Sequence, residues 1–437
     1  METFDVTKSV VSAEDMMDGV DFIDDFSNEL AGYPNRLTGT EQETACARAI
    51  RNRLHDESEV KTRLEAYYAT PLLGRGALAF VGVWYLASLV LYYISFAGGR
   101  VAGALLTALA LVAFLSGSAA FMSLFFGKKT FAGLLGKRVS YNVVSEFSKT
   151  TDKTAKQRTF IIVDNHDAKL GGFFGDIGAF RKLTILISPI SAFLFVLFCI
   201  IKMAVGFDTI AKITALAVLP AIFGLLGAFS IFTHYSPFVR HARQNNGVAT
   251  SVAMATYAYF AENSDKLPDD AKIVYVSLGG ENSAHGGSQA FVRSHPEYAD
   301  AKVLCLQYIR SGNVQIAECD AVRNIKFSKP IVSMVRSSAH EQGVSVEVVP
   351  HDTPKQKLAS LHGYTSNAFA KAGIEAASIV ATGESDHVLD RNDVEKLFSL
   401  TVGAFEKLMA EKQDVKQAEA DVASKSSDME IKDVRGK

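Results

Sequence analysis

The sequence has no excess of either charge and very little cysteine. Its 437 residues include 45 Lys and Arg against 47 Asp and Glu, with only four cysteines. A nearly balanced charge argues against a protein that binds nucleic acid through a basic surface. The cysteines are far apart and form no Cys-x-x-Cys pair, which argues against a disulfide framework or a zinc ribbon. We therefore expect four buried free thiols in a reducing compartment, at Cys46, Cys199, Cys305 and Cys319.

Both ends of the chain lack apolar segments. Residues 1–26 are acidic and contain no apolar core, so we expect no secretory signal peptide. Residues 411–437 are polar, and we expect them to form a disordered tail.

Long uncharged runs, in contrast, are frequent. The mean hydropathy of +0.14 is high for a chain with 21% charged residues, so the apolar residues must be concentrated in parts of it. Four runs of about 19 to 26 residues carry no charge, and this length spans a bilayer core. Core helices of a soluble protein rarely stay uncharged on every face for so long. We predict four transmembrane helices in two hairpins, residues 76–126 and residues 183–233, with the lipid bilayer as a partner.

The cations beside these runs predict the orientation of the hairpins. The short turns inside the hairpins carry Arg100, Lys202 and Lys212. The opposite ends carry nine cations: Arg75, Lys128, Lys129, Lys137, Arg138, Arg181, Lys182, Arg240 and Arg243. By the positive-inside rule, the ends rich in cations lie in the cytoplasm. Each hairpin then returns to the side it left, so residues 1–74, 127–182 and 234–410 are expected to assemble into one discontinuous cytoplasmic domain.

The soluble segments alternate between apolar strands and amphipathic helices. Apolar strands without alternation, separated by helices, predict an α/β fold with a mainly parallel mixed sheet and helices on both faces. The predicted strands lie in residues 158–169, 272–281, 302–312, 343–350 and 376–384. The predicted helices are residues 38–57, with an apolar stripe, residues 246–262, and residues 391–412, with Asn392 or Asp393 as the N-cap. In such folds ligands collect at the carboxyl ends of the strands.

Polar motifs stand at these strand ends. They are DNHDAK with His166, GGENSAHGGS with Glu281, LQYIRSG with Gln307 and GESDHVLD with His387. Together with the opening YPNRLTGTEQETACARAIRNRL and the late segment HGYTSNAFAKAGIEAASI, they resemble the zinc aminopeptidase family of clan MH. That family includes leucyl aminopeptidases, glutamate carboxypeptidases, glutaminyl cyclases and the transferrin receptors. The resemblance covers nearly all of the soluble chain, in order.

The resemblance implies a site with two zinc ions, two histidine ligands, three carboxylate ligands and a glutamate base. Zinc accepts nitrogen and oxygen ligands, and several negative charges must offset two dications. The glutamate takes a proton from metal-bound water. On this resemblance His166 and His387 match the metal ligands, and Glu281 matches the general base.

The three carboxylate ligands, however, have no match. Asn282 and Gln307 stand at two of their positions, and the turn Arg243–Asn245 stands at the third. Amides keep a polar shape but not the charge, so two imidazoles and one glutamate cannot offset two zinc ions. We therefore expect a zinc peptidase-like domain with impaired catalysis, which binds or scaffolds peptides or a membrane protein partner.

Other interpretations stay open. An atypical aminopeptidase or amidohydrolase could use one zinc ion, with Glu281 as base and Asp164, Asp167 or Asp386 recruited as ligands. A transporter is less well supported, since the apolar runs contain no ionisable residue. Glu281 could instead cap the helix that follows it, and the two histidines could simply be hydrogen-bonded loop residues. His285 and Ser288 suggest nucleophilic catalysis only weakly, because no nucleophile elbow is present.

Overall fold

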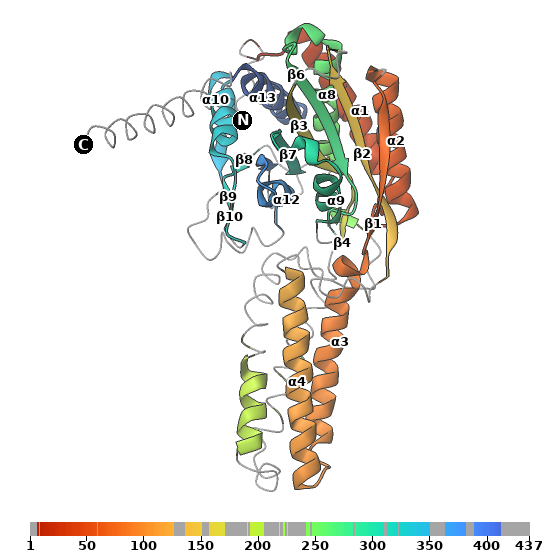
Figure 1. The fold of residues 1–437 in the computed structure, drawn as a ribbon, viewed down its shortest axis with the longest axis vertical. Coiled ribbons are helices and arrows are strands. Elements are labelled where there is room, and N and C mark those ends of the chain that lie inside the picture. Colours follow the sequence, from red (N-terminus) through yellow and green to blue (C-terminus); the bar gives the residue numbers. More distant parts are fainter. Residues whose placement is uncertain are drawn as a thin grey trace, which may run out of the picture.

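The structure is a computed structural model, and it joins a sheet-and-helix body to a bundle of long helices (Figure 1). The description covers residues 7, 9–58, 60–125, 136–150, 157–170, 190, 193–204, 218, 222, 225, 242–244, 247–282, 285–309, 313–321, 323–349, 363–381 and 389–411. The predicted site residues Asn245, Asp386 and His387 lie outside these residues, as do residues 412–437 of the predicted tail. Most of the second predicted hairpin, residues 183–233, also lies outside them.

An eight-stranded mixed sheet forms the centre of the body, in the order β1-β2-β6-β3-β7-β12-β8-β11. Its four central strands run parallel and are buried on both faces. They are β6 (Ala271–Leu278), β3 (Arg158–Asn165), β7 (Lys302–Ile309) and β12 (Glu375–Ala381). The outer strands are β1 (Thr62–Ala69) and β2 (Arg138–Ser148) at one edge, and β8 (Val314–Ala317) and β11 (Val346–Val348) at the other.

Helices cover both faces of the sheet. One face packs into the larger core with α1 (Ala13–Ala31), α2 (Glu41–Ser58), α8 (Gly247–Glu262), α10 (Lys329–Glu341) and α13 (Arg391–Ala410). The other face packs against α9 (Gly286–Ser294) and α12 (Ser366–Lys371). The remaining short elements are β4 (Lys169–Leu170), β5 (Ala242–Gln244), β9 (Cys319–Asp320), β10 (Ile325–Lys326) and the 3₁₀ turns Ser264–Lys266 and Pro296–Tyr298. The predicted mixed α/β sheet with helices on both faces is confirmed.

Two details of the prediction were wrong. The N-cap of α13 is Asp390, whose side chain accepts a hydrogen bond from the Asp393 N–H, so neither Asn392 nor Asp393 is the cap. All four cysteines are free, but only three are buried, because Cys319 lies on the short strand β9 and is partly exposed.

The first predicted hairpin forms two long helices, α3 (Leu72–Ile94) and α4 (Arg100–Phe125), which extend away from the sheet (Figure 1). Within the described residues, one stretch is long and apolar enough to cross a membrane, Arg100–Ala119, with a mean hydropathy of 2.0. The apolar helices Gly82–Ile94 and Phe193–Ala204 are shorter. The core helix of a soluble protein can meet the same criterion, so the four spans and their orientation stay predictions.

Candidate functional site

The loop after β3 places His166 in a fully buried position. Its Nδ1 lies 3.0 Å from Ser277 Oγ on β6, and that hydroxyl donates to Asp164 Oδ1 at 2.7 Å. A carboxylate can only accept, so the Ser277 hydrogen is used there and His166 Nδ1–H must be the donor to Ser277. His166 Nε2 therefore carries a lone pair, and it has no hydrogen-bond partner among the described residues. Burial lowers the pKa of His166 to about 3, so the ring is neutral.

The next residue, Asp167, is clasped by Asn282 from the loop after β6. Its Oδ2 accepts the Asn282 backbone N–H at 2.8 Å, and its Oδ1 accepts the Asn282 side-chain amide at 3.1 Å. Burial raises the pKa of Asp167 well above its usual range, and the nearby Glu43 and Glu281 carboxylates act in the same direction. Asn282, which the sequence resemblance matches to a carboxylate zinc ligand, thus joins two loops.

Glu281 is buried, and both of its carboxylate oxygens are in use. Oε1 lies 2.7 Å from His285 Nδ1 and accepts the Ser288 hydroxyl at 3.0 Å. Oε2 accepts the Ser288 backbone N–H, in the first turn of α9, at 3.0 Å. Glu281 therefore makes the helix-capping contact that was the alternative to a catalytic role. His285 itself has a left-handed backbone (φ 54°), which is uncommon for a residue with a side chain.

A further buried carboxylate, Glu43 of α2, holds the turn that precedes Glu281. Its two oxygens accept the backbone N–H groups of Gly39 at 2.6 Å and Gly280 at 2.7 Å. The backbone at Gly287 packs closely against the turn at Gly279. Residue 287 must be glycine, because a Cβ there would lie 2.2 Å from the Gly279 carbonyl oxygen. The prediction overlooked Glu43. The spacing Thr40-x-x-Glu43, which is that of a capping box, could have identified it.

Gln307 of β7 lies apart from the His166 chain. Its Oε1 accepts the Thr365 N–H at 2.7 Å, and its Nε2 has no partner within the part of the chain that is described. Side chains alternate along a strand, so Gln307 shares the face of Val303 and Cys305, beneath α9 and α12. Asp164 lies on the opposite face, where Thr250 of α8 donates to it at 2.8 Å. The structure thus joins His166, Asp167, Glu281 and Asn282 through their loops but leaves Gln307 beneath the other layer of helices.

The described residues do not fit a dinuclear zinc centre. In that part of the chain, no three His, Cys, Asp or Glu side chains are placed to hold a metal ion together. Of the other predicted positions, Arg243 lies in the short strand β5, and Asn245 and His387 lie outside the description. Within the described residues, His166 Nε2 is a buried nitrogen without a hydrogen-bond partner, and its lone pair would suit a metal.

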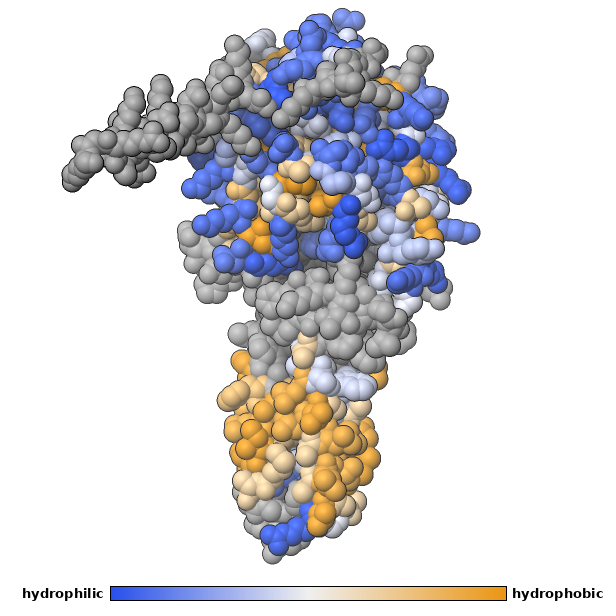
Figure 2. Space-filling view, in the orientation of Figure 1, coloured by the Kyte–Doolittle hydropathy of each residue, from blue (hydrophilic) through white to orange (hydrophobic). Residues whose placement is uncertain are grey.

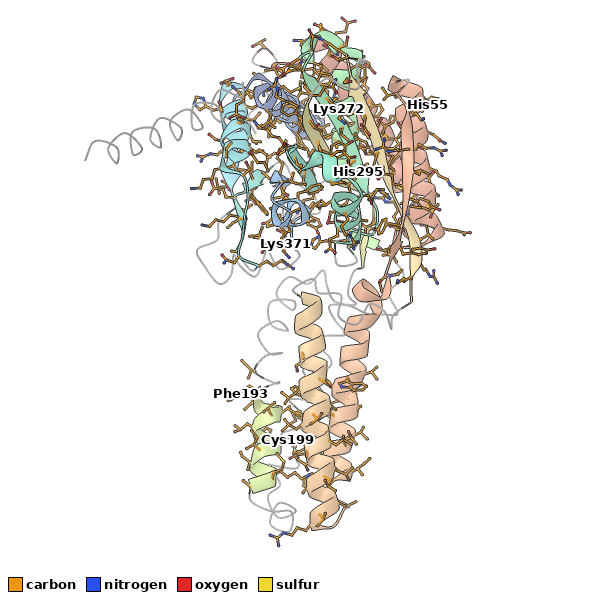
Figure 3. All side chains as sticks on the ribbon, in the orientation of Figure 1. His55, Phe193, Cys199, Lys272, His295 and Lys371 are labelled. Carbon is orange, nitrogen blue, oxygen red and sulfur yellow. The ribbon has the colours of Figure 1, made fainter. Side chains whose placement is uncertain are left out.

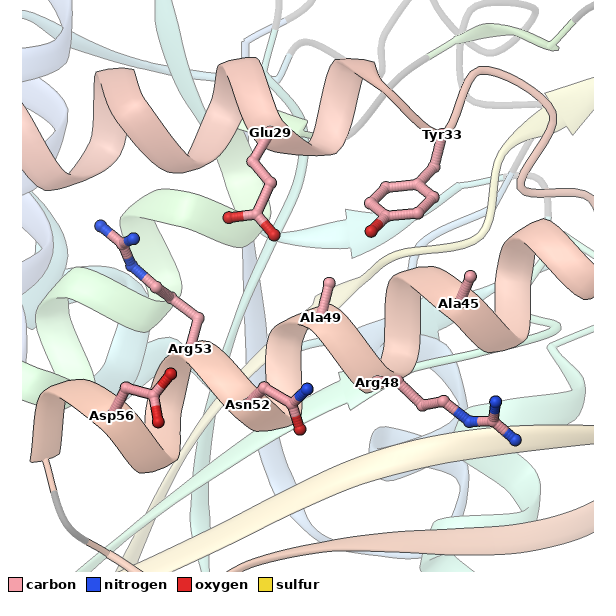
Figure 4. A pocket seen from close by; sticks show the side chains of 8 residues that line it. All are labelled: Glu29, Tyr33, Ala45, Arg48, Ala49, Asn52, Arg53 and Asp56. Atoms are coloured by element: carbon pink, nitrogen blue, oxygen red, sulfur yellow. The ribbon is translucent and has the colours of Figure 1, made fainter.

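Two shallow hollows lie elsewhere, on the outer surface of α1 and α2. One, of about 370 Å³, is drawn in Figure 4 and is lined by Glu29, Tyr33, Ala45, Arg48, Ala49, Asn52, Arg53 and Asp56. The other, of about 650 Å³, adjoins it at Tyr33, Ala45 and Arg48. None of the predicted site residues lines either hollow.

Comparison with known proteins gives likenesses of structure only. No family model matches the sequence, and no curated protein matches it. A zinc-dependent exopeptidase of Parabacteroides distasonis is 10% identical with a TM-score of 0.47, and the match covers 90% of this chain and 98% of that one.

Two further solved structures give similar values. The LapA aminopeptidase of Legionella pneumophila is 10% identical with a TM-score of 0.45, covering 94% of this chain and 78% of that one. A glutaminyl cyclase of Fimbriiglobus ruber is 9% identical with a TM-score of 0.45, covering 89% and 95%. Identities this low with TM-scores below 0.5 do not establish a family.

Proposed function

We propose that the chain is an integral membrane protein whose α/β domain does not catalyse zinc-dependent peptide hydrolysis and instead binds or scaffolds a peptide or a membrane protein partner. One observation carries the proposal: the Glu281 carboxylate is committed to His285, to the Ser288 hydroxyl and to the first turn of α9. A general base must direct a free lone pair at the water it activates. The Glu281 carboxylate instead holds the first turn of α9.

The neighbouring contacts support the same function. Asn282 is uncharged. Its side-chain amide points into the protein, because it donates to Asp167. The buried Asp167 carboxylate accepts from four groups: besides the two of Asn282, these are Thr38 Oγ1 at 3.3 Å and the Asn165 side-chain amide at 3.4 Å. These loops are therefore fixed by hydrogen bonds among themselves, as suits a rigid binding surface.

The membrane part of the proposal rests on the helices α3 and α4. Large apolar side chains cover their outside, and Figure 2 shows them as a continuous hydrophobic surface beyond the polar body. Among these residues are Val90, Val101, Leu105, Leu109 and Val112. Exposed apolar surface of this extent marks contact with a membrane or a partner. We propose two hairpins with the α/β domain on the cytoplasmic side, as the flanking cations predict.

Elemental analysis of the purified full-length protein tests the catalytic part. We expect much less than one zinc ion per chain, and no change in zinc content in His166→Gln. His55→Gln is the matched control, because His55 is exposed on α2. Stoichiometric zinc that disappears in His166→Gln but persists in His55→Gln would overturn the proposal.

A second function has one specific observation in its favour. The unpartnered lone pair on His166 Nε2 could serve an atypical single-zinc aminopeptidase or amidohydrolase, with Glu281 as base. This function requires hydrolysis of an aminoacyl substrate panel to fall at least about 100-fold in Glu281→Gln, the usual contribution of a general base. Activity that is absent, or indifferent to Glu281→Gln, would exclude it.

A further inference from the structure

The strand tip, where β1 ends and β2 begins, comprises residues 67–69 and 137–140. It lies at the junction between the α/β body and α3 (Figure 1). Leu72, the first residue of α3, lies at most about 11 Å from the end of β1, because three extended residues reach no further. If α3 enters a bilayer where the hairpin leaves the body, the strand tip lies at the membrane surface.

One face of the strand tip is fixed to the body. The Tyr67 hydroxyl donates a hydrogen bond to the Gly279 carbonyl oxygen at 2.7 Å. The turn before α2 packs closely against the tip, since a Cβ at Gly39 would lie only 2.8 Å from Arg138 Cβ and 3.0 Å from Pro71 Cγ. The strand tip is therefore held in place beside the residues that lead into α3.

The opposite face of the strand tip exposes apolar side chains. Tyr68 lies directly opposite Val139 in the antiparallel pair, so their side chains point to the same face. Tyr68 is 73% exposed, and Val139 is 41% exposed. Tyrosine is enriched at membrane–water interfaces, where its ring meets the apolar layer and its hydroxyl stays hydrated. The exposed pair is thus suited to contact with lipid.

Two cations stand beside this apolar pair. Arg138 is the first residue of β2 and Lys137 precedes it, and both are exposed. Arg138 Nη1 lies 3.4 Å from the Gly39 carbonyl oxygen, which places the guanidinium beside the turn without burying it. Each Lys or Arg close to an anionic membrane strengthens binding by about fivefold. The strand tip therefore has the composition of a surface that binds anionic lipid.

We propose that the strand tip is a lipid-binding anchor. Tyr68 and Val139 insert between lipid headgroups, while Lys137 and Arg138 bind the acidic groups of anionic phospholipids. The anchor rests on the membrane location given under the proposed function, and it adds the class of lipid and the residues that bind it. Contact at the strand tip holds the α/β body in a fixed orientation against the membrane.

Quenching of tryptophan fluorescence by brominated lipids tests the anchor in the full-length protein. Trp84 is the only tryptophan in the sequence, so Trp84→Phe gives a background without that fluorescence. In this background, Tyr68→Trp places one probe on the exposed face of the strand tip. The protein is placed in nanodiscs of equal parts phosphatidylcholine and phosphatidylserine, with bromine on the acyl chains of one lipid or the other.

Both brominated lipids should quench the Tyr68→Trp probe, and phosphatidylserine should quench it more. The difference should correspond to a preference for phosphatidylserine of at least about fivefold. Adding Lys137→Gln and Arg138→Gln should abolish this preference but leave quenching itself in place, because the ring still lies among the headgroups.

Two controls use exposed residues away from the junction. Lys329→Gln with Arg336→Gln removes two exposed cations from α10, near the opposite edge of the sheet, and should leave the preference unchanged. Met17 is 61% exposed near the start of α1. A probe introduced there by Met17→Trp, in the Trp84→Phe background, should be quenched by neither lipid.

Extraction of membranes with alkaline carbonate separates failure of the anchor from failure of the proposed function. Release of the protein by carbonate would overturn the proposed membrane location and the anchor together. A protein that resists carbonate, but whose Tyr68→Trp probe is quenched by neither lipid, would overturn the anchor alone.

The assignment to anionic lipid has its own tests. Equal quenching by the two lipids, or a preference that survives Lys137→Gln with Arg138→Gln, would overturn it. It would also be wrong if inorganic phosphate abolished the preference when sodium chloride at the same ionic strength did not, because the two cations would then bind a free anion.

Discussion

The α/β body and the helical hairpin both bury apolar side chains, but they expose opposite kinds of side chain. In the body the core is apolar, and apart from a few buried carboxylates most charged residues lie at the surface (Figure 3). In the hairpin the apolar side chains of α3 and α4 face outward, whereas Ser88, Ser95 and Thr107 are fully buried. On the proposed membrane location, the outer surfaces of the two parts are adapted to different solvents, water for the body and lipid for the hairpin.

Hydrogen bonds between hydroxyl and aromatic groups join the hairpin helices. Trp84 Nε1 donates to Ser116 Oγ at 2.7 Å, and the hydroxyls of Tyr85 and Ser118 lie 2.9 Å apart. The Lys202 ammonium, from the helix Phe193–Ala204, donates to the Tyr92 carbonyl oxygen at 3.0 Å. It also lies 3.3 Å from the centre of the Phe96 ring, so it ties this helix to the end of α3. Polar contacts that would be minor on a water-exposed surface here hold helices together.

The largest expected effect comes from a charge on the outer face of α4. Leu109 is 53% exposed near the middle of the apolar stretch Arg100–Ala119. If lipid surrounds this face, Leu109→Arg should disfavour insertion by roughly 3 kcal/mol, the cost of an arginine at the centre of a transmembrane helix. The measurement is the ratio of inserted to non-inserted hairpin in a microsomal assay.

The control for this prediction lies in the body. Met17 of α1 is 61% exposed, about as much as Leu109, but it belongs to a face that should meet water. We expect Met17→Arg to leave both membrane fractionation and stability unchanged, within about 0.5 kcal/mol. If Leu109→Arg behaved like Met17→Arg, the hairpin would not be a membrane element, and the contrast between the two regions would need another cause.

A smaller effect is expected at His295, a largely buried residue just after α9 in the body. Its Nε2 lies 2.8 Å from Glu65 on β1, and its Nδ1 lies 2.7 Å from Glu297. The hydrogen bond with Glu65 raises the pKa of His295 above its ordinary value, although partial burial opposes this. The charged ring therefore stabilises the fold fully below pH 6.5, and this contribution is lost as the pH rises through the higher pKa of the folded state. His295→Gln should cost about 1 kcal/mol at pH 5.5 and much less at pH 9.

Chemical denaturation at both pH values provides the measurement, with the exposed His55 of α2 as control (Figure 3). His55→Gln should change stability equally at the two pH values. A loss in His295→Gln that stays the same from pH 5.5 to pH 9 would show that the ring acts by packing, since it stacks on Tyr298 with centroids 5.3 Å apart.

The fold was predictable where the sequence pattern was strong. The central strands are continuous apolar runs, and the stripe Cys46, Ile50 and Leu54 marked α2, where all three are buried. The outer strands β1 and β2 were not predicted. β1 alternates between half-buried and exposed positions and carries charge, so a single sequence offers no core pattern to recognise there.

The site was less predictable, because its contacts join distant parts of the chain. The sequence motif around Glu281 was recognised, but the resemblance could not tell whether Glu281 is a catalytic base or a helix cap. In the structure, the Glu281 carboxylate caps α9 through the Ser288 N–H. The clasp of Asn282 on Asp167 spans 115 positions in sequence. Asp164 was considered only as a metal ligand, and its bonds to Ser277 and Thr250 depend on strand register and on the packing of α8.

The smallest expected effect compares one kind of hydrogen bond in the two regions. Tyr85→Phe removes the bond to Ser118 between α3 and α4, whereas Tyr257→Phe removes the bond to Ser145 between α8 and β2. Side-chain hydrogen bonds between transmembrane helices contribute about 0.6 kcal/mol on average, because helices separated within lipid still find other partners. A buried bond in a water-soluble body contributes about 1 kcal/mol, and more when its partner is left unpaired. We therefore expect Tyr85→Phe to cost less than Tyr257→Phe in unfolding measured in detergent. If Tyr85→Phe instead cost more than Tyr257→Phe, the Ser118 hydroxyl would find no other hydrogen-bond partner after the helices separate. The bond between α3 and α4 would then contribute more to stability than the buried bond in the α/β body.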